Sequence, residues 1–189
     1  MDFILASASP RRKDLLRQIG LSFQSIPSHL EEDVAAASPG ELVKRLAYGK
    51  ARRISLEEMS LPVLGADTVV VLGGQILGKP RDPRHAVRML HRLQGQSHRV
   101  FTGVALVHGH RGMAAVGLAV TRVWMRPLTL REIKGYVATG EPADKAGAYG
   151  IQGIGGSLIP KIEGCYFNVV GLPLSLTVRM LKAFGVKIF

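Results

Sequence analysis

Three short segments of this chain carry the residue types that phosphate and metal chemistry need. The first, residues 7–12, reads Ser-Ala-Ser-Pro-Arg-Arg and precedes a helical pattern. Ser9 is a good helix N-cap and Pro10 suits the first helical position, so free N–H groups of the first turn predict an anion site. Arg11 and Arg12 add planar, permanently charged donors that match phosphate oxygens. A capped surface helix with solvated arginines fits this segment equally well.

The second segment places a carboxylate inside an apolar run. Asp67 interrupts residues 62–72, where a charge is costly unless it is paired, bound to a metal, or placed at a strand end facing a cleft. A structural aspartate that binds a nearby arginine is the alternative. Lys79 follows the next turn, and its ammonium could reach the same cleft, although Gly-Lys-Pro alone is a weak turn signal.

The third segment is an acidic cluster in an otherwise basic chain. Glu31, Glu32 and Asp33 are consecutive. Mg²⁺ commonly takes one or two protein carboxylates together with substrate phosphates and waters, so the cluster fits part of a magnesium site. A solvated acidic loop fits it equally well. The six histidines show no metal-ligand spacing and are interpreted as surface or packing residues.

Glycines crowd residues 145–156, where the backbone can approach a ligand closely or can simply connect two strands. The segment lacks the Walker pattern Gly-x-x-x-x-Gly-Lys-Ser/Thr and does not fit the dinucleotide fingerprint.

Lys50 lies on a long basic helical pattern, of which only one stripe can face inward.

Composition indicates a globular protein with an acidic partner. The chain has 189 residues, of which 47% are hydrophobic and 21% charged, enough for one substantial core or two small lobes around a cleft. The net charge of +11 points to a nucleotide, a nucleic acid or a membrane surface. Because the Lys and Arg residues are scattered and only 6% of residues are aromatic, a small ligand is favoured over a nucleic-acid groove. The single cysteine, Cys165, excludes an intrachain disulfide.

The N-terminus does not resemble a secretory signal. Charged residues 11–13 follow a short apolar stretch, and no cleavage pattern comes after them. No apolar run approaches the length needed to cross a bilayer. We therefore expect a cytoplasmic protein that does not bind a membrane.

Strands and helices alternate along the chain, with hairpins between some of them. Strands are expected at residues 2–7, 22–26, 62–72, 75–77, 98–107 and 113–125, with one or two more before the C-terminal helix. Helices are expected at residues 10–19, 39–58, 82–95, 129–140 and 173–184. This order predicts a mixed sheet with flanking helices.

Taken together, these segments resemble the signature blocks of the Maf nucleotide pyrophosphatases, in matching order along essentially the whole chain. The blocks are residues 5–12, 31–32, 45–51, 65–68, 78–80, 102–104, 144–153 and 170–173. Ser-Pro-Arg-Arg, Ala-Asp-Thr and Ala-Tyr-Gly-Ile-Gln-Gly are similar to the branch that acts on dTTP and UTP. The branch that acts on 7-methyl-GTP typically has tryptophan in place of the first arginine and differs at the other two blocks.

The resemblance implies a single Maf-like domain over residues 1–189. Its fold would be α/β of the Maf/ITPase type, with a mixed, strongly curved sheet, flanking helices and two lobes around a central cleft. Its reaction would be hydrolysis of a nucleoside triphosphate, here dTTP, UTP or a modified pyrimidine nucleotide, to the monophosphate and pyrophosphate. This is a housecleaning role in the nucleotide pool. A divalent metal, Mg²⁺ or Mn²⁺, and a homodimer are also implied.

The resemblance also implies roles for single residues. Asp67 would accept the proton of the attacking water or bind the metal, which Glu32 would support. The triphosphate would be held by Ser7, Arg11, Lys50 and Lys79. The positions that match the family's specificity residues are Arg12, Thr68 and Gln152.

Two alternatives remain open at this point. One is the 7-methyl-GTP branch, and the other is a non-enzymatic regulator of cell division or a nucleic-acid binder, which the positive charge permits. The second leaves Asp67 and the acidic cluster unexplained, because carboxylates that face nucleic acid are repelled. The expected partner is therefore a nucleoside triphosphate, with no stable nucleic acid.

Overall fold

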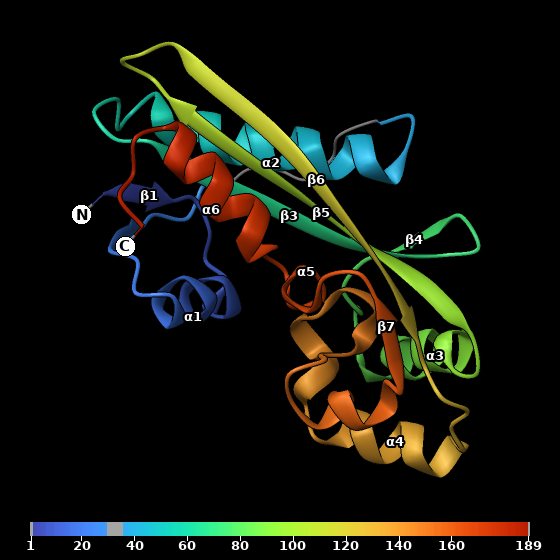
Figure 1. Cartoon of the computed structure of the whole chain (residues 1–189). Coiled ribbons are helices and arrows are strands. Elements are labelled where there is room, and N and C mark those ends of the chain that lie inside the picture. The colour runs from blue at the N-terminus through green and yellow to red at the C-terminus, as the bar shows by residue number, and fades with distance from the viewer. Residues whose placement is uncertain (1, 30–35, 189) are drawn as a thin grey trace. The chain divides into compact units, whose positions relative to one another are not determined.

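The protein is a mixed α/β structure built on one sheet. The computed structural model describes residues 2–29 and 36–188 (Figure 1). Within them the strand order is β2-β1-β3-β5-β6-β7, and β4 pairs with β3. The strands are β1 (Phe3–Leu5), β2 (Phe23–Ser25), β3 (Val63–Leu72), β4 (Gln75–Leu77), β5 (Ser97–His108), β6 (Met113–Trp124) and β7 (Lys161–Glu163). Because β1 is parallel to β2 and β3 while β4 and β7 pair antiparallel with their neighbours, the predicted mixed sheet is confirmed.

The long helices begin close to the predicted residues. They are α1 (Pro10–Gln18), α2 (Pro39–Ser55), α3 (Pro83–Leu93), α4 (Leu130–Ala138) and α6 (Leu174–Ala183). The side chains of Ser38, Asp82 and Thr129 accept backbone N–H groups in the first turns of α2, α3 and α4, as capping residues do. Ser9 is the N-cap of α1, but the expected side-chain cap is wrong, because its side chain makes no capping hydrogen bond.

Four short helical segments were not expected from the sequence. Three are 3₁₀ helices in and around the glycine-rich stretch, namely η1 (Glu141–Asp144), η2 (Ala146–Ala148) and η3 (Ile154–Leu158). The fourth is α5 (Tyr166–Val170). Segments of three to five residues are too short to show a hydrophobic period, so the sequence pattern does not predict them.

Contacts divide the chain into two compact units. Unit 1 comprises Met1–Thr68, Thr102–Ala119 and Gly171–Phe189, and unit 2 comprises Val69–Phe101 and Val120–Val170. Each unit has its own cluster of buried apolar side chains. The single domain over residues 1–189, the strong curvature of the sheet and the cleft between lobes stay predictions.

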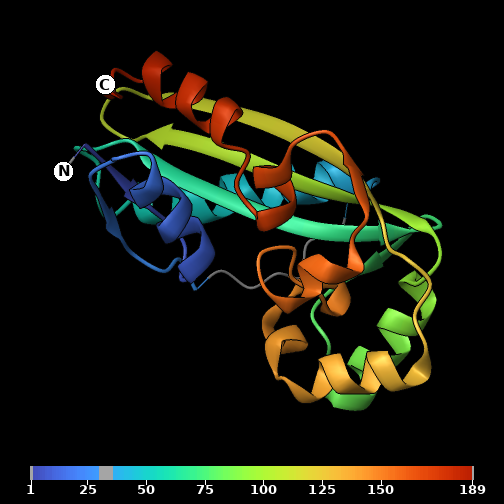
Figure 2. The ribbon, with the colours of Figure 1, turned by 60° about the horizontal axis from the view of Figure 1, so that its bottom comes forward.

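In unit 1, two helices cover opposite faces of the sheet. Figures 1 and 2 show α2 on one face and α6 on the other. Two buried strand residues, Gly65 on β3 and Gly103 on β5, lie under α2, and a Cβ at either position would overlap the backbone of that helix. Glycine is therefore required at both positions, because it allows α2 to approach the strands more closely than any side chain would permit.

In unit 2, α3 and α4 pack together over a core that also takes in the 3₁₀ segments. Its fully buried members include Leu90, Leu93 and Ile133, with Tyr136 and Tyr149 nearly so. The amphipathic spacing of α3 accounts for this, because Ala86, Met89, Leu90 and Leu93 all lie on its inward face. This core supports the glycine-rich stretch.

Candidate active site

A carboxylate and an ammonium form a buried ion pair in unit 1. Lys50 Nζ on α2 donates to Asp67 Oδ1 on β3 at 2.6 Å, and the two side chains are 12% and 10% exposed. The close approach of α2 at Gly65, two residues before Asp67 on the same face of β3, brings the lysine within reach. The charge inside the apolar strand is thus paired with a lysine rather than with the arginine that the structural alternative expected.

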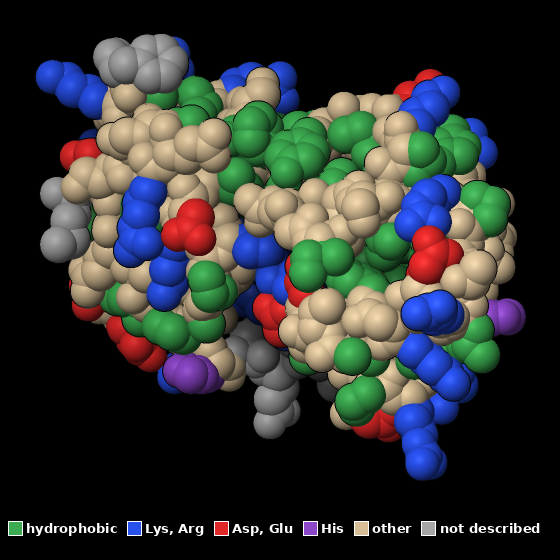
Figure 3. Space-filling view, turned by 90° about the horizontal axis from the view of Figure 1, so that it is seen from below, with side chains coloured by type: hydrophobic (Ala, Val, Ile, Leu, Met, Phe, Trp, Pro, Cys, Tyr) green, Lys and Arg blue, Asp and Glu red, His purple; other side chains and the backbone are tan. Residues whose placement is uncertain are grey.

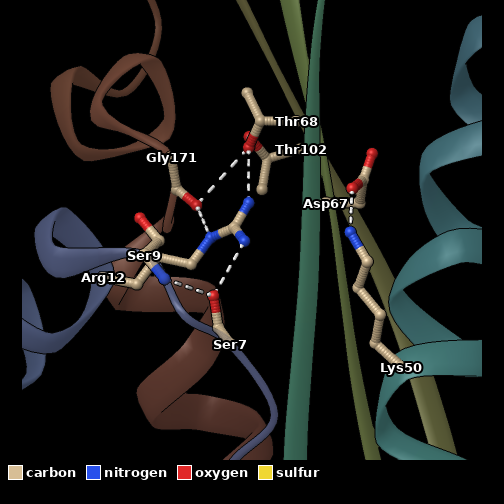
Figure 4. A network of polar contacts seen from close by, with 8 residues as sticks. All are labelled: Ser7, Ser9, Arg12, Lys50, Asp67, Thr68, Thr102 and Gly171. Atoms are coloured by element: carbon tan, nitrogen blue, oxygen red, sulfur yellow. Dashed lines mark hydrogen bonds and ion pairs between the residues drawn. The ribbon is translucent and has the colours of Figure 1, made fainter. Parts of the chain in front are cut away.

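A second network joins three distant parts of unit 1 through one guanidinium. Arg12 Nε donates to the Gly171 carbonyl oxygen at 2.9 Å, Nη1 to Ser7 Oγ at 3.2 Å, and Nη2 to Thr68 Oγ1 at 3.2 Å (Figure 4). Arg12 is therefore a crosslink between the end of β1, the middle of β3 and the turn before α6. The fixed fork of the arginine side chain suits this role, since one planar group can donate in several directions.

Two partners in this network, Thr102 and Gly171, were missed as site residues by the sequence reasoning. Thr102 Oγ1 lies 2.9 Å from Thr68 Oγ1, and Gly171 adopts a φ of 124°, which residues with a side chain rarely adopt. Both belong to blocks of the family resemblance, and a glycine just before Leu-Pro was the available signal for a special turn.

The two groups of polar side chains lie on opposite sides of β3. Figure 4 shows Asp67 pointing toward α2, and its neighbour Thr68 pointing toward Arg12 and Gly171. This follows from the period of two in a strand, which sends adjacent side chains to opposite faces. Asp67 and Thr68 are therefore adjacent in sequence but hold different partners.

Ser7 is buried at the junction between β1 and α1. Its Oγ accepts the Ser9 N–H and an Arg12 N–H, both at 3.2 Å, and 7% of the residue is exposed. A serine hydroxyl that accepts two hydrogen bonds still has one proton to donate. Arg11 lies half-buried in the first turn of α1, and its role at an anion site stays a prediction.

The remaining predicted site residues belong to unit 2 or lie outside the described residues. Lys79, after β4, and Gln152, between η2 and η3, both belong to unit 2 and are exposed. Glu32 and the rest of the acidic cluster lie outside the described residues. Unit 1 thus brings together Ser7, Arg12 and Thr68 in one network and Lys50 and Asp67 in an ion pair.

A buried imidazole contacts the glycine-rich stretch through Tyr149. His98 Nε2 lies 2.7 Å from the Tyr149 hydroxyl, and its Nδ1 has no hydrogen-bond partner among the described residues. Burial lowers the pKa of His98 to about 4 and raises the pKa of the Tyr149 phenol. At neutral pH the pair is therefore uncharged, which fits the interpretation of His98 as a packing residue.

Asp67 is the candidate metal ligand in the described part of this site. Among residues 2–29 and 36–188 no three His, Cys, Asp or Glu side chains are grouped as metal ligands. Lys50 contacts Asp67 Oδ1, and Figure 4 shows the second carboxylate oxygen pointing away from the ammonium. One carboxylate oxygen fits Mg²⁺ or Mn²⁺ that draws its other ligands from phosphates and waters.

On one face of the molecule, the charged side chains are distributed rather than gathered in a single patch. On the face seen in Figure 3, Lys and Arg side chains form several separate groups, with Asp and Glu between them.

Among the helices described, none is both long and apolar enough to cross a membrane.

Residues 2–184 match the sequence profile of the family described as Maf-like protein, and the chain belongs to this family. It is 54% identical over 187 residues to the dTTP/UTP pyrophosphatase of Symbiobacterium thermophilum, covering 98% of this chain and 95% of that one. It is 50% identical over 183 residues to the dTTP/UTP pyrophosphatase of Escherichia coli O157:H7, covering 96% and 92%. A solved nucleoside-triphosphatase, a dITP/XTP pyrophosphatase from Mycobacterium abscessus, aligns over 98% of this chain and 97% of its own, with a TM-score of 0.47 and 14% identity.

Proposed function

We propose that this protein is a nucleoside triphosphate pyrophosphatase that hydrolyses dTTP and UTP to the monophosphate and pyrophosphate. The observation that carries the proposal is the buried ion pair between Lys50 and Asp67. It is supported by relatives with 50% and 54% sequence identity, which are named dTTP/UTP pyrophosphatase. We place the enzyme in the cytoplasm, acting on free nucleotides, and the homodimer stays a prediction.

Asp67 is the proposed proton acceptor for the attacking water. Lys50 holds one carboxylate oxygen at 2.6 Å and fixes the direction of the other, which points away from it. A positioned carboxylate can take a proton from water as the bond to phosphorus forms. The Lys50 ammonium also adds positive charge beside the developing negative charge on the phosphate.

The end of β1 and the first turn of α1 are the proposed triphosphate contacts. Ser7 Oγ already accepts two hydrogen bonds, so its proton can be donated to a phosphate oxygen. Arg11 in the same turn adds a permanent charge, and the N-terminus of α1 favours an anion. Lys79 stays a prediction as a further phosphate contact.

Base choice is proposed to depend on Arg12, Thr68 and Gln152. Uracil and thymine present two carbonyl acceptors on either side of an N3–H donor, a pattern that hydroxyl, amide and guanidinium groups can match. In the structure Arg12 is hydrogen-bonded to Thr68, so its proposed contribution is to hold that hydroxyl in place. Cytosine reverses part of the pattern and would leave buried partners unpaired.

A divalent metal, Mg²⁺ or Mn²⁺, is proposed as the cofactor, with Asp67 as its ligand in the described chain and Glu32 as a second carboxylate. When bound, such an ion neutralises charge on the phosphates and orients them. The protein residues then position the attacking water and the pyrimidine base of the nucleotide.

A panel of nucleotides tests this proposal. The purified protein is incubated with dTTP, UTP, CTP and 7-methyl-GTP in Mg²⁺ or Mn²⁺, and pyrophosphate release is measured as kcat/KM. We expect dTTP and UTP to be preferred over CTP by about 10²-fold or more, because mismatched buried polar groups are costly. A preference for 7-methyl-GTP would overturn the branch. Absence of turnover together with tight binding to DNA would favour the non-enzymatic alternative.

A further inference from the structure

The loop that carries Gln152 is held at both of its ends. On one side, the backbone N–H of Gly150 donates to the Tyr136 hydroxyl at 3.0 Å. On the other side, the N–H groups of Ile154 and Gly155 donate to the two carboxylate oxygens of Glu141, at 2.8 and 3.0 Å. Gln152 lies midway between these anchors, so its backbone has little freedom to move.

The two anchoring side chains are themselves joined. The Tyr136 hydroxyl donates to Glu141 Oε1 at 2.8 Å, so one phenol and one carboxylate form a continuous clamp from α4 and η1. Tyr136 is 5% exposed and belongs to the unit 2 core, which fixes the position of its hydroxyl. Lys145 Nζ adds a bond of 2.6 Å to the Glu141 carbonyl oxygen.

Glycines around Gln152 make room for this clamp. A Cβ at Gly153 would overlap the Glu141 carboxylate, and a Cβ at Gly155 would overlap the Tyr136 hydroxyl. Both positions have ordinary φ angles rather than positive ones, so close approach explains the glycines better than backbone strain does. The clamp therefore accounts for glycine at two positions of the stretch.

The protonation states suit the direction of each hydrogen bond. Burial opposes the charge on Glu141, but hydrogen bonds from Gly155, Tyr136 and Ile154 outweigh it and hold the pKa of the carboxyl below its usual value. Burial raises the pKa of the Tyr136 phenol. At neutral pH an ionised carboxylate thus accepts three hydrogen bonds, one of them from a phenol that keeps its proton.

From this geometry we infer that Glu141 and Tyr136 are positioning residues for base recognition, because they fix the backbone on both sides of Gln152. The inference rests on the proposed function, in which Gln152 reads the pyrimidine. A side chain held on a rigid backbone discriminates between ligands better than one on a mobile loop, since less ordering is needed on binding. Neither residue needs to touch the nucleotide for this effect.

Glu141→Gln is the principal test variant. Glutamine keeps the volume but places an NH₂ donor at one of the two oxygen positions, so one loop N–H loses its acceptor. Tyr136→Phe removes both hydrogen bonds of the hydroxyl, the one accepted from Gly150 and the one donated to Glu141, and it keeps the aromatic ring in the core without changing charge. Glu132→Gln is the matched control, because Glu132 also accepts a backbone N–H, from Thr129 at 2.7 Å, but lies at the start of α4 and outside this loop.

The measured quantity is the ratio of kcat/KM for dTTP to that for CTP. We expect this ratio to fall by about 10-fold in Glu141→Gln and in Tyr136→Phe, with kcat on CTP little changed, as the loss of a charge-assisted hydrogen bond would produce. The Glu132→Gln control is expected to retain the ratio of the unsubstituted enzyme. In a Gln152→Ala background the Glu141→Gln change is expected to alter the ratio by less than about 2-fold, because coupled residues are non-additive.

Amide exchange supplies a readout independent of turnover. The N–H groups of Ile154 and Gly155 are expected to exchange faster in Glu141→Gln than in Glu132→Gln. An unchanged dTTP to CTP ratio in a folded Glu141→Gln enzyme would overturn the inference. So would a full effect of Glu141→Gln in the absence of the Gln152 side chain. If the unsubstituted enzyme releases no pyrophosphate from dTTP, the proposed function fails instead, while amide exchange still reports on the clamp.

Discussion

The Lys50 ammonium lies 2.6 Å from Asp67 Oδ1, and nine-tenths of each side chain is removed from water. Such a pair contributes little net stability, because desolvation offsets much of the attraction. Its presence inside an apolar strand is better explained by chemistry than by folding. If one partner is removed, the other keeps a partly buried charge without a counter-ion.

Replacing Asp67 separates catalysis from stability. In Asp67→Asn the amide is nearly isosteric but cannot take a proton from water, so we expect kcat on dTTP to fall by about 10² or more. We expect circular dichroism to show the native fold and thermal unfolding to show a lowered Tm, because the Lys50 ammonium keeps a partly buried charge without a counter-ion. Normal kcat with a lowered Tm would show that Asp67 is only a structural partner of Lys50.

Arg12→Lys tests the crosslink between three segments of unit 1. A lysine keeps the charge, but a single ammonium cannot reproduce the fork that reaches Ser7, Thr68 and Gly171 together. We expect the free energy of unfolding in urea to fall by about 1–3 kcal/mol and the preference for dTTP over CTP to weaken. Full stability with an unchanged preference would contradict the crosslinking role.

Gly65→Ala tests how the close approach of α2 positions Lys50. The added methyl group would overlap the backbone of α2, so we expect a loss of at least about 2 kcal/mol in the free energy of unfolding, together with reduced kcat. Gly135→Ala on α4 is the control, since a Cβ there meets nothing within 4 Å. In an exposed helix that change should stabilise by about 0.5–1 kcal/mol. Equal effects of the two substitutions would refute the packing argument.

The buried His98 predicts a pH dependence of stability. Its pKa is about 4 in the folded protein, against about 6.5 for an unperturbed imidazole. As pH falls from 6.5 toward 4, the unfolded chain binds a proton that the folded chain refuses, so the free energy of unfolding decreases, by about 3 kcal/mol at most. Urea unfolding of His98→Gln, which cannot titrate, should show a correspondingly smaller loss. Parallel pH curves for the two proteins would contradict this.

Much of the fold follows from local signals that the sequence displays. The helices expected at residues 39–58 and 129–140 are present and are capped by Ser38 and Thr129. The strand expected at residues 62–72 accounts for the opposite directions of Asp67 and Thr68, because adjacent side chains of a strand point to opposite faces. Asp67 itself was identified because a charge in an apolar strand needs a reason.

Other features could not be predicted because they depend on contacts between distant residues. Arg12 and Gly171 are separated by 159 positions, and no local pattern pairs them. Glu141 stands in an ordinary Gly-Glu-Pro sequence, and two of its three partners are backbone N–H groups, which cannot be recognised from side-chain types. The same reasoning explains why Ser9 looked like a side-chain cap while its N–H instead donates to Ser7.

The central claim is the position of the bond that is cleaved. Chromatography of the products formed from dTTP by the purified protein with Mg²⁺ or Mn²⁺ tests it most directly, with Asp67→Asn as the control of reduced activity. The account predicts dTMP and pyrophosphate in equal amounts, with both formed about 10²-fold or more slowly by the variant. Formation of dTDP and inorganic phosphate would contradict it.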